Sequence, residues 1–113
     1  MRRARNEELV LPVLVASVRA ARWASRGERM NMLDLVLMLV VRYDMFGYRQ
    51  ADIGRGLGLN VRTVNERLKR LRRLGLVSYG RGKSIDLTEE GKKMIRGYAQ
   101  LYGESYRLLF GRE

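Results

Sequence analysis

The chain has 113 residues, of which 23 are Lys or Arg and 12 are Asp or Glu, so its net charge is +11. Its length and its hydrophobic share of 46% are typical of one globular domain with a modest core. It contains neither cysteine nor histidine, which excludes a disulfide framework, thiolate or imidazole metal sites, and catalysis by a Cys nucleophile or a His base. We therefore expect no enzymatic activity, no metal and no cofactor. The scarcity of Asn, Gln and Cys is compatible with a thermophilic source.

The opening segment combines a basic start with an apolar run over Leu9–Val18. Such a run resembles the core of an export signal, but Pro12 and Ser17 interrupt it and arginines follow it closely. The run is also far shorter than the ~20 apolar residues that span a bilayer. We expect instead an amphipathic helix over residues 8–25, with Pro12 in its first turn and Gly27 at its end. This interpretation favours a cytoplasmic protein without a membrane segment.

Three helices are predicted in the middle of the chain. The first, residues 30–43, is apolar on nearly all sides, which indicates burial against more than one neighbour. A short second helix follows over residues 50–56, and Gly58 permits the tight turn after it. Asn60 is a good N-cap for the third helix, which ends near Leu74, and Gly75 is suited to the position after its C-cap.

A hairpin and a last helix complete the predicted elements. Residues 76–79 and 84–87 are predicted to be the two strands of a hairpin, and the Gly-rich segment 80–83 forms the tip between them. Thr88, followed by two glutamates, is typical of a helix N-cap with acids in the first turn. The last helix either continues to the end of the chain or breaks at Gly103.

Most of the excess charge lies between Arg49 and Lys83. This segment holds ten basic and two acidic residues, and so carries eight of the eleven net positive charges. Residues 1–48 carry a net charge of +3 and residues 84–113 carry none. The preference for Arg over Lys suits contacts with phosphates and guanine, but a GC-rich genome explains that preference equally well. The position of the charge is therefore stronger evidence than the type of basic residue. Positive charge concentrated on two helices joined by a turn predicts binding to nucleic acid.

The order of the predicted elements is that of a winged helix–turn–helix. The segments DIGRGLGLNVRTV at 52–64 and LKRLRRLGLV at 68–77 resemble the tri-helical core of bacterial and archaeal transcription regulators. The segment LTEEG at 87–91 resembles the one that follows the wing in regulators of the MarR type and their archaeal relatives. The resemblance covers residues 31–100. It implies a mostly α-helical fold with a small β-hairpin: a three-helix core plus a wing, with additional N- and C-terminal helices.

The chain departs from that family at three points. Arg49 stands where the family usually has a Ser or Thr cap. Gly54 and Gly56 are each expected to weaken the second helix by roughly 1 kcal/mol relative to Ala. The Cys and His metal ligands of the ArsR-type sensors are absent.

The third helix carries the candidates for base recognition. Val61, Val64, Leu68 and Leu71 are expected on its inner face. The last three recur at helical spacing and define the buried face, so the opposite face is free to contact DNA. Arg62 and Arg67 are the candidates for reading bases, since Arg bonds bidentately to guanine. For each of them, a phosphate contact or a solvated side chain is the alternative.

The remaining candidates contribute in other ways. Thr63 and Asn65 are suited to bases or phosphates, while Glu66 is suited to a cytosine amino group or to orienting a neighbouring arginine. The basic run Lys69–Arg73 is expected to position phosphates, and Arg81 to enter a minor groove, with plain solvation as the alternative for both. The full set of predicted DNA-binding residues is Arg49, Gln50, Asn60, Arg62, Thr63, Asn65, Glu66, Arg67, Lys69, Arg70, Arg73, Arg81 and Lys83.

Three segments of the chain are expected to have different functions. Residues 30–88 form the DNA-binding domain, and the helices of residues 1–29 and 89–113 carry more apolar surface than a small monomer buries easily, so they are assigned to dimerisation. The sequence thus favours a homodimeric, sequence-specific regulator of transcription that binds double-stranded DNA. A non-specific architectural or chromatin protein and a winged helix that binds another protein are the alternatives. The operator, the direction of regulation and any small-molecule effector stay open.

Overall fold

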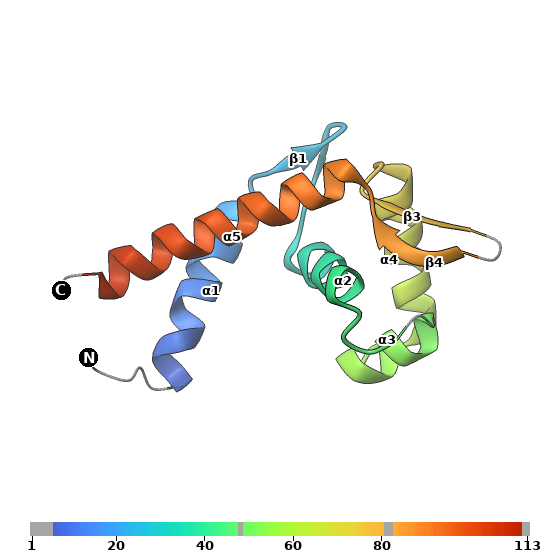
Figure 1. The fold of residues 1–113 in the computed structure, drawn as a ribbon, viewed down its shortest axis with the longest axis horizontal. Coiled ribbons are helices and arrows are strands. Elements are labelled where there is room, and N and C mark those ends of the chain that lie inside the picture. The colour runs from blue at the N-terminus through green and yellow to red at the C-terminus, as the bar shows by residue number, and fades with distance from the viewer. Residues whose placement is uncertain (1–5, 48, 81–82, 112–113) are drawn as a thin grey trace. The chain divides into compact units, whose positions relative to one another are not determined.

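The computed structural model describes residues 6–47, 49–80 and 83–111. They form two compact units: a central unit, Leu33–Ile95, and a flanking unit made of the residues before and after it. The predicted fold class is confirmed, because the chain is mostly helical with a small antiparallel hairpin on a winged-helix core (Figure 1). In chain order the elements are α1 (Asn6–Ala20), β1 (Ala24–Ser25), β2 (Glu28–Arg29), α2 (Met32–Tyr43), α3 (Gln50–Leu57), α4 (Val61–Arg73), β3 (Val77–Gly80), β4 (Lys83–Leu87) and α5 (Glu89–Phe110).

The central unit has a core of large aliphatic side chains. Helix α2 buries residues on several sides, as predicted for a helix that is apolar nearly all round. Helix α4 buries the predicted stripe, and the strands of the wing add further apolar side chains. The buried hydrophobic residues of this unit are Leu35, Leu37, Met38, Val40, Val41, Ile53, Val64, Leu68, Leu71, Leu74, Leu76, Val77, Leu87 and Ile95.

The turn between α3 and α4 depends on two glycines. Gly58 has φ +70°, the left-handed conformation predicted for this position. Gly54 is buried, and a Cβ there would lie 2.8 Å from the carbonyl oxygen of Leu59. Gly56 likewise faces the ring of Phe46, where a Cβ would clash. From the sequence, Gly54 and Gly56 are expected only to lower the stability of helix α3. The structure shows that both glycines also allow close packing around this helix.

Helix α4 ends in the way its sequence predicts. Gly75 follows the C-cap with φ +79°. The Gly75 amide donates to the carbonyl of Arg72 at 3.0 Å, and the Leu76 amide donates to the carbonyl of Leu71 at 2.9 Å. These two bonds form a Schellman motif, which satisfies the last carbonyls of the helix and directs the chain into β3.

The wing is the antiparallel pair β3 and β4. Val77 pairs with Leu87 and Ser78 with Asp86, while an irregularity between Ser78 and Gly80 shifts the register toward the tip. The predicted strand segments are therefore confirmed, with β3 and β4 each displaced by about one residue from the prediction.

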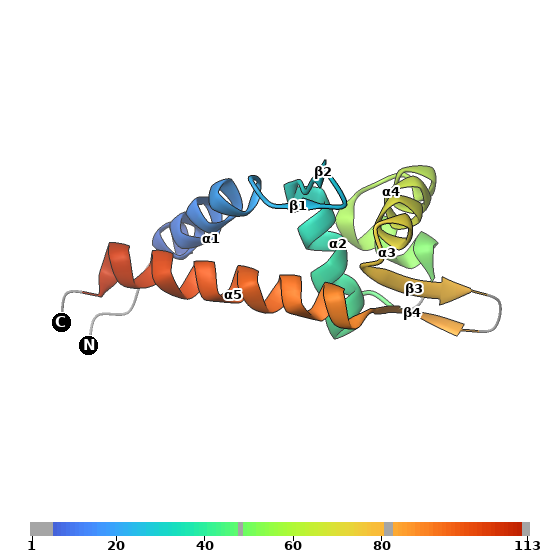
Figure 2. The ribbon, with the colours of Figure 1, turned by 90° about the horizontal axis from the view of Figure 1, so that it is seen from above.

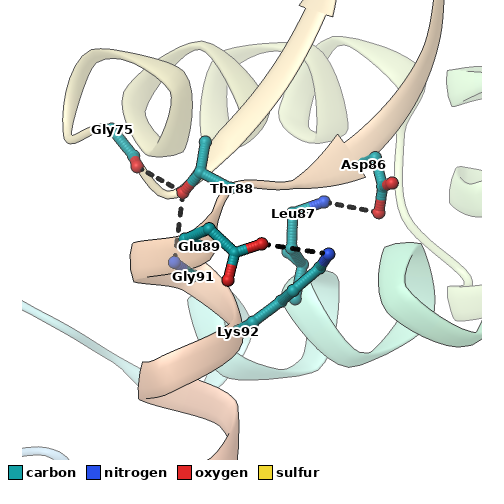
Figure 3. A network of polar contacts seen from close by, with 7 residues as sticks. All are labelled: Gly75, Asp86, Leu87, Thr88, Glu89, Gly91 and Lys92. Atoms are coloured by element: carbon teal, nitrogen blue, oxygen red, sulfur yellow. Dashed lines mark hydrogen bonds and ion pairs between the residues drawn. The ribbon is translucent and has the colours of Figure 1, made fainter.

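Thr88 joins the end of α4 to the start of α5 (Figure 3). Its hydroxyl donates to the carbonyl of Gly75 at 2.6 Å and accepts from the amide of Gly91 at 3.1 Å, which confirms the predicted N-cap. Its own amide donates to the carbonyl of Leu76 at 3.1 Å. A Cβ on Gly91 would clash with that same carbonyl. Thr88 and Gly91 are thus required by the junction itself.

In the flanking unit, α1 packs against the later turns of α5 (Figure 2). The hydroxyl of Ser17 lies 2.9 Å from that of Tyr98, which also donates to the carbonyl of Val13 at 3.3 Å. Arg19 and Glu104 form an exposed ion pair at 3.9 Å. These polar contacts connect the two helices beside the small buried side chains of α1, Ala16 and Ala20.

The N-terminal prediction needs correction. Helix α1 starts at Asn6 and ends at Ala20, so Pro12 lies in its second turn, and the segment that follows is the hairpin β1–β2. Arg26 with φ 50° and Gly27 with φ 82° occupy the two-residue turn of that hairpin. Gly27 therefore serves a hairpin turn and not a helix end. Strands of two residues carry no alternating pattern, which is why the sequence does not reveal them. Helix α5 continues through Gly103 without a break.

Candidate nucleic-acid interface

Helix α4 separates an apolar face from a polar one. Val64, Leu68 and Leu71 are fully buried, as their spacing predicts, whereas Val61, also expected on the inner face, is 48% exposed at the start of the helix. The side chains that share the opposite face are exposed: Arg62, Glu66, Lys69 and Arg73. Three further predicted residues, Thr63, Asn65 and Arg67, are half-buried along the flanks of that face.

The first turn of α4 is organised by its own side chains. Asn60 Oδ1 accepts a hydrogen bond from the Arg62 amide at 2.8 Å, which confirms the predicted N-cap. Arg62 Nε lies 3.4 Å from Glu66 Oε1, and both side chains are largely exposed, at 86% and 66%. Because an exposed pair of this kind contributes only about 0–1 kcal/mol, it orients Arg62 without holding it back from a ligand.

The side chains of Gln50 and Asn65 lie close together although the two residues are 15 positions apart in the sequence. Asn65 Nδ2 donates to Gln50 Oε1 at 2.9 Å, so the start of α3 is tied to the second turn of α4. Arg49 precedes Gln50 as the exposed N-cap residue of α3, and its side chain makes no capping bond. The predicted departure from a Ser or Thr cap therefore leaves this guanidinium at the surface.

Arg70 has a different environment from the other basic residues of α4. Its guanidinium Nη1 lies 2.5 Å from Asp34 Oδ2, with Asp34 fully buried and the Arg70 side chain only 18% exposed. Arg70 thus connects α4 to α2, a contact that the sequence did not predict, while its predicted phosphate contact stays a prediction. Asp34 was missed by the sequence analysis, although an acidic residue inside the run Met32–Val41 is a signal for a buried ion pair.

The other basic residues surround the polar face. Lys69 and Arg73 are exposed, and Arg67 is half-buried. Arg72 lies over the ring of Tyr79 on β3, with its Cζ 4.4 Å from the ring centroid. This cation–π contact connects the end of α4 to the wing and was not anticipated. Arg81 lies outside the described residues, and only the backbone of Lys83, at the start of β4, is described.

Within residues 6–47, 49–80 and 83–111, no group of His, Cys, Asp or Glu side chains is arranged to hold a metal ion. In the same part of the chain, no helix is both long and apolar enough to cross a membrane.

Comparison with known proteins supports the architecture. No model of a known protein family matches the chain, and no curated protein matches it significantly. Among solved structures, the chain is similar to the reduced form of MarR from E. coli, with a TM-score of 0.62 and 15% sequence identity. The match covers 96% of this chain and 81% of that one. The chain therefore has a MarR-like winged-helix fold.

Proposed function

We propose that this protein is a transcription regulator that binds double-stranded DNA as a homodimer and recognises a specific sequence. The single observation that carries the proposal is the exposed polar face of α4, which bears Arg62, Lys69 and Arg73 opposite a buried apolar face. The helix belongs to a winged-helix fold, in which the N-terminal part of such a helix enters the major groove.

The distribution of charge supports a polyanionic partner. Eight of the eleven net positive charges lie between Arg49 and Lys83, the segment that contains α3, α4 and the wing. Charge concentrated in this way attracts phosphate and releases counterions on binding. With ~6 phosphates neutralised, the logarithm of affinity should fall with the logarithm of salt concentration at a slope of roughly −5.

The proposed DNA-binding residues fall into groups that contact different parts of the DNA. Arg62 and Arg67 are proposed to read base edges, with Glu66 orienting Arg62. Arg49, Lys69 and the other exposed basic residues of α4 are proposed to contact phosphates. The wing tip with Arg81 and Lys83 is proposed to approach the minor groove. Arg70 is left out because Asp34 occupies its guanidinium.

The flanking unit supports the proposed homodimer. On α1, apolar side chains lie open to solvent, and a shallow apolar depression is lined by Leu14, Val15, Val18 and Arg19. The last turns of α5 expose Leu108 as well. A second copy of the chain would bury these residues, and a two-fold axis would present two α4 helices about 34 Å apart to successive major grooves.

A selection of duplexes from a random pool, followed by anisotropy titrations, tests the function directly. Arg62→Ala and Arg67→Ala should each cost about 1–3 kcal/mol of binding and relax the preference at one base step. Arg72→Ala, outside the reading face, should weaken binding to all sequences alike. Unchanged binding in all three variants would remove α4 from the interface.

The same titrations separate the alternative functions. Equal affinity for selected and random duplexes would favour a non-specific architectural protein. Absence of duplex binding even at low salt would favour a protein partner with an acidic surface.

A further inference from the structure

The side-chain amides of Gln50 and Asn65 connect the two helices of the helix–turn–helix. Asn65 Nδ2 donates to Gln50 Oε1 at 2.9 Å. Gln50 is the first residue of α3, and Asn65 lies in the second turn of α4, beside the exposed Glu66. Both residues are half-buried.

This bond couples the orientations of the two amides. An unrestrained amide can turn by 180° and exchange its oxygen with its nitrogen. In the structure the nitrogen of Asn65 faces the oxygen of Gln50, so the Asn65 amide donates and the Gln50 amide accepts. Since that nitrogen carries two hydrogens and Gln50 accepts one, Asn65 keeps a second N–H donor beside its Oδ1 acceptor. No other described residue forms a hydrogen bond with this amide.

An adjacent donor and acceptor match one base in the major groove. Adenine presents the N7 acceptor beside the N6 donor, whereas guanine presents two acceptors, thymine an acceptor and a methyl group, and cytosine a donor. A phosphate offers only acceptors, so it would use the N–H of the amide and leave Oδ1 without a donor.

We propose that Asn65 reads an adenine of an A·T base pair through N6 and N7. Gln50 is a positioning residue, because it holds the Asn65 amide in the orientation that this contact needs. The inference rests on the proposed function and deepens it, since it assigns a base to one position of the recognised sequence.

The first test leaves the protein unchanged. Wild-type protein is titrated with the duplex recovered from a random pool, in which each adenine is replaced in turn by 7-deazaadenine. That analogue keeps its Watson–Crick pairing but lacks N7. A whole bidentate base contact corresponds to about 5- to 150-fold in affinity. Because 7-deazaadenine removes only the N7 bond, one adenine per half-site should bind severalfold more weakly, within that range. The other adenines should respond little.

The second test uses variants on the same two duplexes. Asn65→Ala should bind the adenine and the 7-deazaadenine duplex with equal affinity. Gln50→Met, which removes the acceptor, should lower the ratio of the two affinities severalfold without changing the salt dependence. Gln50→Glu should restore the ratio, since it keeps an acceptor oxygen, although its charge weakens binding to every duplex. Gln100→Met, at an exposed position of α5, is the matched control and should leave the ratio unchanged.

Two results would overturn the inference while leaving the proposed function intact. One is that no adenine responds to the loss of N7. The other is that Asn65→Ala, with wild-type thermal stability, weakens both duplexes by the same factor. Failure of wild-type protein to bind any duplex at low salt would overturn the proposed function and this inference with it.

Discussion

The central and flanking units differ in what they bury. The central unit encloses Ile53, Leu68 and Leu71 completely. In the flanking unit the buried residues of α1 are Pro12, Ala16, Ser17 and Ala20, while the larger Val10, Leu14 and Val18 are open to solvent. The central unit thus completes its core within one chain, and the flanking unit leaves apolar surface that a monomer does not cover. Under the proposed homodimer, folding and assembly would therefore depend on separate parts of this sequence.

Asp34→Ala should have the largest effect, because it leaves the Arg70 guanidinium without its carboxylate inside the central unit. We expect the free energy of unfolding in urea to fall by about 3–5 kcal/mol. The double variant Asp34→Leu with Arg70→Met should recover most of that loss. The control is Asp52→Ala, which breaks the exposed pair with Arg55 and should cost less than about 1 kcal/mol. Equal effects at the two aspartates would contradict a special role for the buried pair.

Val18→Asp should weaken dimerisation with little effect on the central unit. Val18 is 71% exposed in the chain, so a monomer would tolerate the charge. If a second copy buries it, losing about 1.5–3 kcal/mol per valine should raise the dissociation constant at least tenfold in sedimentation equilibrium. Val61→Asp, which changes an exposed valine of the central unit, should leave the dimer unchanged. A wild-type chain that is monomeric at micromolar concentration would end the dimer proposal.

Gly91→Ala and Gly103→Ala should change stability in opposite directions although both lie in α5. A Cβ at Gly91 meets the carbonyl of Leu76, and the resulting strain should cost about 1–3 kcal/mol. A Cβ at Gly103 has no neighbour within 4 Å, so higher helix propensity should add roughly 0.5–1 kcal/mol. Thermal unfolding of the two variants measures both effects. A loss at Gly103 would mean that the chain uses that surface for contact with another molecule.

Asn60→Ala should have the smallest effect, a loss of about 1 kcal/mol from the missing N-cap of α4. Asn60→Ser keeps an oxygen that can accept from the Arg62 amide and should keep wild-type stability. DNA affinity should follow stability in both variants, because the Asn60 oxygen is already bonded within the helix. If Asn60→Ser folds normally but loses affinity, Asn60 contacts DNA through a group other than its capping oxygen.

The sequence predicted those elements that depend on residues close together in the chain, such as helix caps and turns. Asn60, Gly75 and Thr88 occupy the caps and turns expected of them, because each position needs a particular side chain or a left-handed backbone. The buried stripe of α4 was likewise predictable from helical spacing alone. The hairpin at Arg26–Gly27 was not, since its strands are too short to leave a period in the sequence.

The candidate site shows the same limit. The sequence predicted that Arg62 and Arg67 read bases and that the run Lys69–Arg73 positions phosphates, and it gave Arg70 the same role as its neighbours in that run. It could not separate Arg70, paired with a buried carboxylate, from Arg62, exposed beside Glu66. That distinction depends on Asp34, which lies in another helix far away in the chain.

By itself, the sequence determined the order of the elements, the buried face of α4 and the concentration of charge between Arg49 and Lys83, because propensity, periodicity and charge are properties of neighbouring residues. Only the tertiary structure decided which groups lie close together. Arg70 pairs with Asp34, Asn65 bonds to Gln50, and the backbone of Gly91 packs against the carbonyl of Leu76. These pairings depend on packing between segments that are distant along the chain. They decide which charged and polar side chains are already occupied within the protein and which remain available to a partner.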